Sequence, residues 1–499
     1  MYSIQYKMHK LIEDKPMQRQ VFPVQGRKWN PATILDESAW ILYNMTRPEY
    51  TSYDFGRMCA PMKISVKKLD FEKAMAKTRP EHRHPRKPGI FWRTLIRLLT
   101  VFGMMGTQFK YEEERMDLIG KDEPCLILMN HSCFLDMQIA YRIMYPRAFN
   151  IICTSDAFVG FWGLMGWLMR TIGCVPTQKF VTDLRLVQDM EYCFKTLKSS
   201  VLMYPEASYS FDGTCTPLPR KMGVLLKKFD VPVVMIETFG AFSRNPLYNE
   251  LQVRKGVPVS AKIRCLYTRE EIREKSVKEL SDGLDAAFGF DHFKWQKENG
   301  IEIHDSFRAD GLSRILYKCA HCGAEGKMEG RGTTLTCGHC GKVYELTPLG
   351  QLQAQEGQTE FSHIPDWFAW EREQVRREIL DGTYRLETDV KISLLVDFKN
   401  IYDVGEGHLV HDRDGFRLTG CDGRLEYVQK PQSCYGLYAD YYWYEIADVI
   451  CIGDNETLYY CFPKNSGDVV AKTRLATEEM YKLYKARKLR APEKASETV

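Results

Sequence analysis

His131 and Asp136 lie five positions apart in the segment NHSCFLD, directly after the apolar run CLILM. A carboxylate that accepts from one imidazole nitrogen fixes the tautomer and leaves the other nitrogen to accept a proton from a hydroxyl group. Because residues five apart on an ideal helix are rotated by about 140°, the side chains can meet only if His131 lies in a loop and Asp136 in the first turn of the next helix. The pair is then a candidate general base; a buried histidine beside an unrelated helical residue is the alternative.

The segments around this pair predict the elements that must position it. Between about residues 89 and 300, the short apolar runs CLILM, FNIICT, SVLMYP, VPVVMIET and AKIRCLY alternate with amphipathic segments such as DLRLVQDMEYCFKTLK. This alternation predicts an α/β domain with a mixed, mainly parallel sheet flanked by helices. His131 would follow the carboxyl end of one strand, where open α/β sheets bind their ligands.

Three further segments follow NHSCFLD along the chain: IGCVPTQKFVTD (172–183), YPEASYSFDG (204–213) and VPVVMIETFG (231–240). The four segments, in this order, resemble the four sequence blocks of the glycerolipid acyltransferase family, the lysophospholipid acyltransferases. The resemblance implies that residues 89–300 form an acyltransferase domain. It also implies substrate-binding roles for the positions that match the blocks: Asn130 in the first, Gly173 and Lys179 in the second, and Tyr204, Pro205, Glu206 and Ser208 in the third.

The sequence departs from the family pattern at positions that bear on the acceptor. Lys179 stands where the family usually has arginine, which keeps the charge but loses the bidentate fork that suits a phosphate. In the third block, Ala207 replaces a glycine and Tyr209 replaces an arginine that normally helps to hold the acceptor's phosphate. A glycerol phosphate acceptor is therefore in doubt, although Arg220 and Lys221 lie just downstream and could supply the charge.

The resemblance implies direct transfer of an acyl group from a thioester of coenzyme A or acyl carrier protein. His131, oriented by Asp136, would deprotonate an acceptor hydroxyl or amine, and Glu206 would position that acceptor. Lys179 and backbone amides of the blocks are candidate donors to the tetrahedral oxyanion. Cys133 is an alternative nucleophile, whereas the absence of a G-x-S-x-G segment argues against an α/β-hydrolase. A catalytically inactive lipid-binding or scaffold protein is the alternative function that the altered third block allows.

Two apolar segments predict contact with a membrane surface. Residues 89–105 would form a helix with Arg93 and Arg97 on one side and apolar residues on the other, and residues 157–169 form an uncharged run containing Trp162 and Trp167. Packing of both segments within the protein is the alternative.

No stretch reaches the roughly 18 to 20 apolar residues that span a bilayer, and the first residues lack the features of a secretory signal. We therefore expect a cytoplasmic protein, peripherally bound to the cytoplasmic face of the membrane, with membrane lipids and possible acyl carrier protein as partners.

Four of the sixteen cysteines form two C-x2-C pairs, Cys319 with Cys322 and Cys337 with Cys340. Two such pairs on glycine-containing turns favour a closed, tetrahedral site for structural Zn²⁺, which predicts a zinc ribbon over residues 315–346. The second pair, CGHC, also matches thiol oxidoreductases, so a zinc-dependent thiol enzyme is a competing hypothesis. In those enzymes the pair opens a helix, whereas the extended run GKVYEL follows Cys340 here.

The whole chain has 499 residues, which predicts two to four domains. Its net charge of +4 is too small to indicate a nucleic-acid partner. Residues 1–88, with a helical pattern at 31–46, are predicted as an N-terminal accessory region. Residues 364–490 are predicted as an amphipathic helix, a small antiparallel β domain with Asp-Gly turns at 414–415 and 422–423, and a closing helix at 478–489. The pattern leaves the acceptor, the acyl length and the oligomeric state open.

Overall fold

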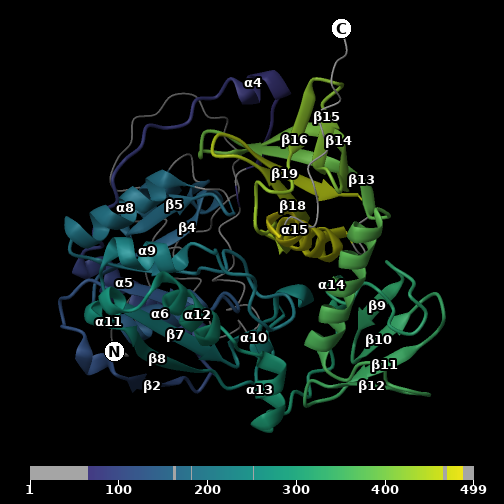
Figure 1. Ribbon diagram of the computed structural model, residues 1–499, viewed down its shortest axis with the longest axis horizontal. Helices are drawn as coiled ribbons and strands as arrows, with labels where there is room; N and C mark the ends of the chain where they lie inside the picture. Colours follow the sequence, from purple (N-terminus) through teal and green to yellow (C-terminus); the bar gives the residue numbers. More distant parts are fainter. Residues whose placement is uncertain are drawn as a thin grey trace, which may run out of the picture. The chain divides into compact units, whose positions relative to one another are not determined.

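Figure 1 shows a computed structural model of the chain. It describes residues 64, 66–160, 164–180, 183–250, 252–464 and 469–486. All of them belong to one compact unit, which begins at Phe55. The predicted helical stretch at 31–46, Trp162 and the last residues of the predicted closing helix, 487–489, lie outside the described residues.

The first sheet has seven strands in the order β2-β8-β7-β3-β6-β4-β5. Their bounds are Lys110–Glu114 (β2), Leu126–Met129 (β3), Phe149–Thr154 (β4), Cys174–Thr177 (β5), Ser200–Met203 (β6), Val233–Phe239 (β7) and Ser260–Tyr267 (β8). All neighbours pair parallel except β7 and β8, which pair antiparallel. The predicted mixed, mainly parallel sheet is confirmed.

Helices cover both faces of this sheet. The side chains of β3 alternate between the faces: Ile127 and Met129 pack in a core with α6, whereas Leu126 and Leu128 pack in a second core with α8, α9 and α12. The helices in this part of the chain are α4 (Phe71–Met75), α5 (Ile90–Gly103), α6 (Asp136–Met144), α7 (Leu164–Thr171), α8 (Leu184–Lys195), α9 (Met222–Phe229), α10 (Ala241–Arg244), α11 (Arg269–Glu274), α12 (Val277–Ala287) and α13 (His292–Glu298).

A small antiparallel sheet follows, with the strand order β12-β11-β10-β9. The strands are Met328–Arg331 (β9), Thr334–Cys337 (β10), Val343–Leu346 (β11) and Leu352–Ala354 (β12). Helix α14 (Ile364–Asp381) comes next and ends at Gly382, whose φ of 73° gives the left-handed conformation typical of a helix C-terminus. The predicted helix at this position is confirmed, and Figure 1 shows it running from the small sheet toward strand β13.

The third sheet has eight strands, with the order β16-β15-β14-β13-β19-β18-β17 and β1 paired to β14. The bounds are Val66–Lys68 (β1), Arg385–Leu395 (β13), Ile401–Asp412 (β14), Gly415–Gly420 (β15), Leu425–Gln429 (β16), Tyr438–Trp443 (β17), Ala447–Gly453 (β18) and Leu458–Pro463 (β19). Every pairing is antiparallel except that of β1 with β14. The predicted antiparallel β domain is thus present, with one strand added from the region that we assigned to the N-terminus.

The closing helix, α15 (Val469–Lys485), begins earlier than the predicted start at Glu478. Its first half carries Lys472 and Arg474, which do not form an apolar stripe in the sequence, yet both are buried. One core cluster joins this helix to distant segments: Leu475 of α15, Trp367 of α14, Leu335 of β10 and Phe211 of the third block belong to it together. The C-terminal elements therefore directly support the loop that the third block forms, residues 204–213, which we call the third-block loop.

Candidate functional site

The loop between β3 and α6 brings His131 and Asp136 together. Asp136 is the first residue of α6, and its Oδ2 lies 2.9 Å from His131 Nδ1. The same oxygen accepts hydrogen bonds from the backbone N–H groups of Ser132 (2.7 Å) and Cys133 (3.1 Å). The arrangement is the predicted one, with the histidine in the loop and the carboxylate reaching back from the first helical turn.

The electrostatics of this pair favour a neutral imidazole with a free acceptor nitrogen. Burial, together with the positive charge of Lys179, holds the pKa of His131 well below its usual value of 6.5. Burial raises the pKa of Asp136, while the backbone N–H groups of Cys133 and Ser132 act in the opposite direction. Oδ2 already accepts from two backbone N–H groups, so an ionised Asp136 selects the tautomer in which Nδ1 of His131 donates to Oδ2 and Nε2 can accept a proton.

Two tyrosine rings enclose the imidazole. The ring of Tyr204 stacks on His131 with centroids 4.0 Å apart and planes at 20°, and the ring of Tyr209 lies 3.9 Å away at 32°. Two rings so close to one imidazole cannot share a face, so they lie on opposite faces and fix its plane. Tyr209 stands where the family pattern has arginine, so this departure gives the histidine a second stacking partner.

The third-block loop is fastened to the histidine by Glu206. This fully buried carboxylate accepts from the backbone N–H of His131 (3.0 Å) and from that of Thr216 (2.9 Å). Burial raises its pKa to about 7. The next residue, Ala207, has a φ of 54°, a left-handed conformation that explains physically why the family pattern has glycine here. Glu206 contacts backbone groups on both sides, and its predicted role in positioning the acceptor stays a prediction.

A cavity of about 1050 Å³ opens beside the imidazole. Its lining includes His131 and five of the predicted substrate-binding residues: Lys179, Tyr204, Pro205, Arg220 and Lys221. The other four predicted residues, Asn130, Gly173, Glu206 and Ser208, are absent from its lining within the described ranges. The structure therefore separates the predicted substrate-binding residues into five that line the cavity and four that do not.

Two of the four residues that do not line the cavity, Asn130 and Gly173, hold the backbone of the blocks in place. Asn130 Oδ1 accepts from the backbone N–H of Thr238 (2.9 Å), which ties the first block to the end of β7. Gly173 has a φ of 93°, and a Cβ there would lie 2.9 Å from Pro88 Cδ, so the position needs glycine both for its backbone and for space.

Part of this chain is similar in sequence to known proteins. Residues 110–236 match the family model described as Acyltransferase. This segment belongs to the acyltransferase family. A curated relative, the chloroplastic 1-acyl-sn-glycerol-3-phosphate acyltransferase BAT2 of Brassica napus, is 29% identical over 137 residues, which cover 27% of this chain and 38% of the relative. The crystal structure of the 1-acyl-sn-glycerophosphate (LPA) acyltransferase PlsC from Thermotoga maritima aligns over 52% of this chain and 88% of its own, with 16% identity and a TM-score of 0.31.

The acyltransferase segment forms only part of the cavity wall. Residues far beyond it complete the lining, among them Tyr438, Asp440, Trp443, Tyr444 and Tyr481. The ammonium group of Lys179 lies over the ring of Tyr438, with Nζ 4.1 Å from the centroid. Burial lowers the pKa of Lys179, and the charges of Asp440 and Asp156 oppose this shift. Sequence reasoning missed these residues; the tyrosine-rich run around β17 was the available signal.

Cys133 lines the cavity but is not suited to nucleophilic attack. It is almost completely buried, and burial, reinforced by the negative charge of Asp136, raises its pKa well above the usual value of 9.0. A thiol that stays protonated at neutral pH is a poor nucleophile. Cys133 is therefore a poor candidate for the nucleophile.

The four cysteines of the C-x2-C pairs converge in space. Their sulfur atoms all lie within 4.8 Å of one another, with Sγ of Cys319 3.9 Å from that of Cys340 and Sγ of Cys322 3.8 Å from that of Cys337. Four sulfur ligands at about 2.3 Å from a tetrahedral Zn²⁺ would lie about 3.8 Å apart. The donor set and its spacing therefore fit a zinc ion.

Both cysteine turns have the same backbone form. The N–H of Gly323 donates to the carbonyl of Cys319 and the N–H of Gly341 to that of Cys337, each at 2.9 Å. The two glycines have φ values of 75° and 76°, which side-chain-bearing residues rarely adopt. The repeated turn is what two equivalent metal-binding knuckles require.

Proposed function

We propose that this chain is a membrane-associated acyltransferase that moves a fatty acyl group from an acyl thioester to a hydroxyl or amine of a glycerolipid acceptor. The observation that carries the proposal is the hydrogen-bonded pair of His131 and Asp136. The pair lies in the segment that matches the acyltransferase family, and its imidazole lines a large cavity. Residues 89–300 would be the catalytic domain.

The proposed reaction is a direct transfer. Nε2 of His131 takes the proton of the acceptor hydroxyl while the hydroxyl oxygen attacks the thioester carbonyl. The tetrahedral intermediate collapses as the C–S bond breaks, and the imidazolium returns the proton to the departing thiolate. The ammonium group of Lys179 lies in the same cavity and would stabilise the negative charge that develops on the carbonyl oxygen.

The test of this function is transfer of a labelled acyl group. The purified chain is incubated with radiolabelled acyl-coenzyme A, or with acyl carrier protein bearing the same acyl group, and with single-chain glycerolipids that have or lack a phosphate. We expect the label to appear in a two-chain lipid, identified by mass spectrometry. Failure of both donors with every acceptor would contradict the proposal.

The cavity rim predicts where phosphate groups of the substrates bind. Arg220 and Lys221 are exposed and line the cavity, so the double variant Arg220→Ala/Lys221→Ala is expected to raise KM for a phosphate-bearing substrate about tenfold, equivalent to about 1.4 kcal/mol of binding, with kcat almost unchanged. Steady-state kinetics at two salt concentrations measure this. The control Arg220→Lys/Lys221→Arg should behave as wild type. An unchanged KM would place the phosphate elsewhere.

Helix α5 supports the membrane association because its polarity is inverted for a helix of a soluble protein. Its arginines face the protein: Arg97 donates to the carbonyl of Arg142 in α6 (3.1 Å) and Arg93 to that of Pro146. Its apolar side chains face outward, with Phe91 67% and Leu98 60% exposed. Apolar groups in this position suit a bilayer interface.

Exposed apolar side chains also occur on α7 and at the cavity. Trp92 of α5 meets Trp167 of α7, their ring centroids 6.3 Å apart, and Trp167 is itself 51% exposed. Phe134 and Met137 are both exposed and line the cavity. An acyl chain could pass along these side chains from a bilayer to the imidazole. Within the described ranges, no helix has the length and apolarity needed to cross a membrane.

Substitution on α5 tests the membrane proposal. The variant Phe91→Glu/Leu98→Glu is expected to reduce binding to anionic phospholipid vesicles at least tenfold in a sedimentation assay, because each apolar side chain that enters a membrane contributes about 1.5 to 3 kcal/mol. Val428→Glu, at an equally exposed apolar position on β16, should bind as wild type does. Recovery of the wild type in the supernatant alone would refute the proposal.

We also propose that Cys319, Cys322, Cys337 and Cys340 hold a structural Zn²⁺. Their four thiolates would fill a tetrahedral coordination sphere and leave no open position for a substrate. The ion would stabilise the β9–β12 sheet and have no direct part in acyl transfer.

A further inference from the structure

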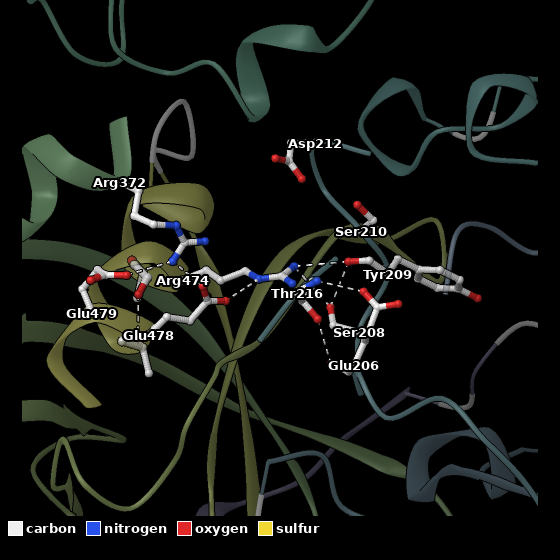
Figure 2. Close-up of polar contacts among 12 residues, drawn as sticks. Glu206, Ser208, Tyr209, Ser210, Asp212, Thr216, Arg372, Arg474, Glu478 and Glu479 are labelled. Carbon is white, nitrogen blue, oxygen red and sulfur yellow. Dashed lines mark hydrogen bonds and ion pairs between the residues drawn. The ribbon is translucent and has the colours of Figure 1, made fainter. Parts of the chain in front are cut away.

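One guanidinium group from the end of the chain lies against the third-block loop. Arg474 of α15 is 3% exposed, and its Nη1 donates to the Oγ of Ser208 and to the carbonyl oxygen of Tyr209, both at 3.3 Å. Figure 2 shows the side chain spanning from its own helix to this loop. The contact joins residues that are 265 positions apart in the sequence.

Arg474 is itself held by an ion pair and by an aromatic ring. Its Nε donates to Glu478 on the next turn of α15 (3.2 Å), and Glu478 also accepts from Arg372 of α14 (2.6 Å). The guanidinium carbon lies 4.0 Å from the centre of the Phe211 ring. A buried arginine that is fixed by an ion pair and an aromatic ring has little freedom, so the two donors that it offers to the loop have a defined place.

The loop that Arg474 holds is the one that contacts His131. Tyr209, whose carbonyl accepts from Arg474, stacks its ring on the imidazole. The same short loop carries Glu206, which accepts from the backbone N–H of His131. A shift of this loop would therefore move both the ring that covers the imidazole and the carboxylate that fixes its backbone.

We propose that Arg474 is a positioning residue for acyl transfer, which holds Ser208 and Tyr209 so that the Tyr209 ring stays stacked on His131. The inference rests on the proposed function. It gives a physical account of the altered third block: the arginine that the family has at position 209 is absent, and a guanidinium from α15 supports the same loop from behind. Arg474 does not appear in the lining of the cavity described above, so it acts through Tyr209 and not on the substrate.

The proposal differs from a purely structural role in what it says about the imidazole. Burial lowers the pKa of His131, and the Tyr209 ring covers one imidazole face. Loss of that ring from its place would hydrate the imidazole and move its pKa upward, toward 6.5. Because the base must be neutral, the acid limb of the pH–rate profile would then move to higher pH.

The variants Arg474→Met and Tyr209→Leu test the proposal. Each is expected to lower kcat at least tenfold with the KM for the thioester within about twofold, since a small misplacement of catalytic groups can cost as much as about 10²-fold. The double variant should be no slower than the slower single variant, because both changes remove the same contact, the stacking of the Tyr209 ring on His131. Tyr209→Phe, which keeps the ring, should lose less activity than Tyr209→Leu.

A matched control separates positioning from general stability. Arg376 of α14 donates to Glu479 of α15 (3.1 Å) and so also links the two helices, whereas the hydrogen bonds to Ser208 and Tyr209 come from Arg474. Arg376→Met is expected to leave kcat and the pH profile unchanged. A thermal melt of each variant confirms that it is folded.

The imidazole titration is followed by nuclear magnetic resonance of histidine-labelled protein, with His131→Gln used for assignment. We expect the His131 pKa to rise in Arg474→Met and Tyr209→Leu and to stay constant in Arg376→Met. An unchanged titration in Arg474→Met, or effects of the two substitutions that multiply in the double variant, would overturn the inference. This titration needs no turnover, so it gives a result even if the wild type transfers no acyl group, an outcome that would instead refute the proposed function.

Discussion

Replacing His131 with alanine is expected to lower kcat of acyl transfer by about 10²- to 10⁴-fold, the range that a general base typically contributes. The reason is geometric: Nδ1 is engaged by Asp136 at 2.9 Å, which leaves Nε2 as the proton acceptor beside the cavity. KM should change little, because the imidazole acts mainly in the transition state. The measurement is steady-state transfer of a labelled acyl group from its thioester.

Asp136→Asn is the companion variant. The amide keeps the volume of the carboxyl group but can no longer accept three hydrogen bonds as an anion, so the imidazole loses the partner that selects its tautomer. We expect a fall in kcat of at least tenfold without unfolding.

Equal rates for the wild type and His131→Ala would instead favour a lipid-binding or scaffold protein that keeps the acyltransferase fold without catalysis.

The pH dependence follows from the lowered pKa of His131. A base whose pKa lies below 6.5 remains neutral at pH 7, so the titration of His131 should leave kcat/KM level across neutral pH. It should fall only as the pH drops through the lowered value, because the imidazole then becomes protonated. An acid limb centred above pH 6.5 would contradict the burial that the structure gives this histidine.

The sequence-based prediction succeeded where a local pattern controls the structure. Strand β3 is buried on both faces, which produces the continuous apolar run that the prediction used. His131 and Asp136 also lie within one loop and one helical turn, so their contact follows from short-range geometry. Strand β2 was missed for the complementary reason: its sequence, KYEEE, is exposed throughout, as suits an edge strand that charged residues protect from further pairing.

The missed parts of the site depend on contacts between distant segments. Nothing around Tyr438 or Asp440 in the sequence indicates that they face Lys179, because the fold of the C-terminal sheet decides this. Arg474 presented a similar difficulty, since a buried arginine in a polar stretch does not predict a helix face or a partner. The density of tyrosines near β17 was informative, as aromatic side chains are common in binding sites, but it does not specify the site.

Removal of zinc is expected to have the largest effect on stability. A structural zinc site contributes about 10 to 16 kcal/mol of binding free energy at neutral pH, so Cys340→Ser should lower the free energy of unfolding by several kcal/mol and release most of the metal. Cys340 suits the test because it is exposed and its replacement leaves little packing defect. Denaturant titration and metal analysis of the purified chain measure the two effects, with Cys215→Ser, at a half-buried cysteine outside the cluster, as the control.

The effect should reach the acyltransferase site through the shared core. Leu335 and Tyr344 of the small sheet lie in one cluster with Trp367 of α14, and α14 carries Arg372, which anchors Glu478 and through it Arg474. Loss of zinc should thus reduce acyl transfer in parallel with stability. A Cys340→Ser chain that loses catalysis while it remains as stable as the wild type would favour a thiol enzyme, and one that keeps full stability and activity would show that the cysteine cluster needs no metal.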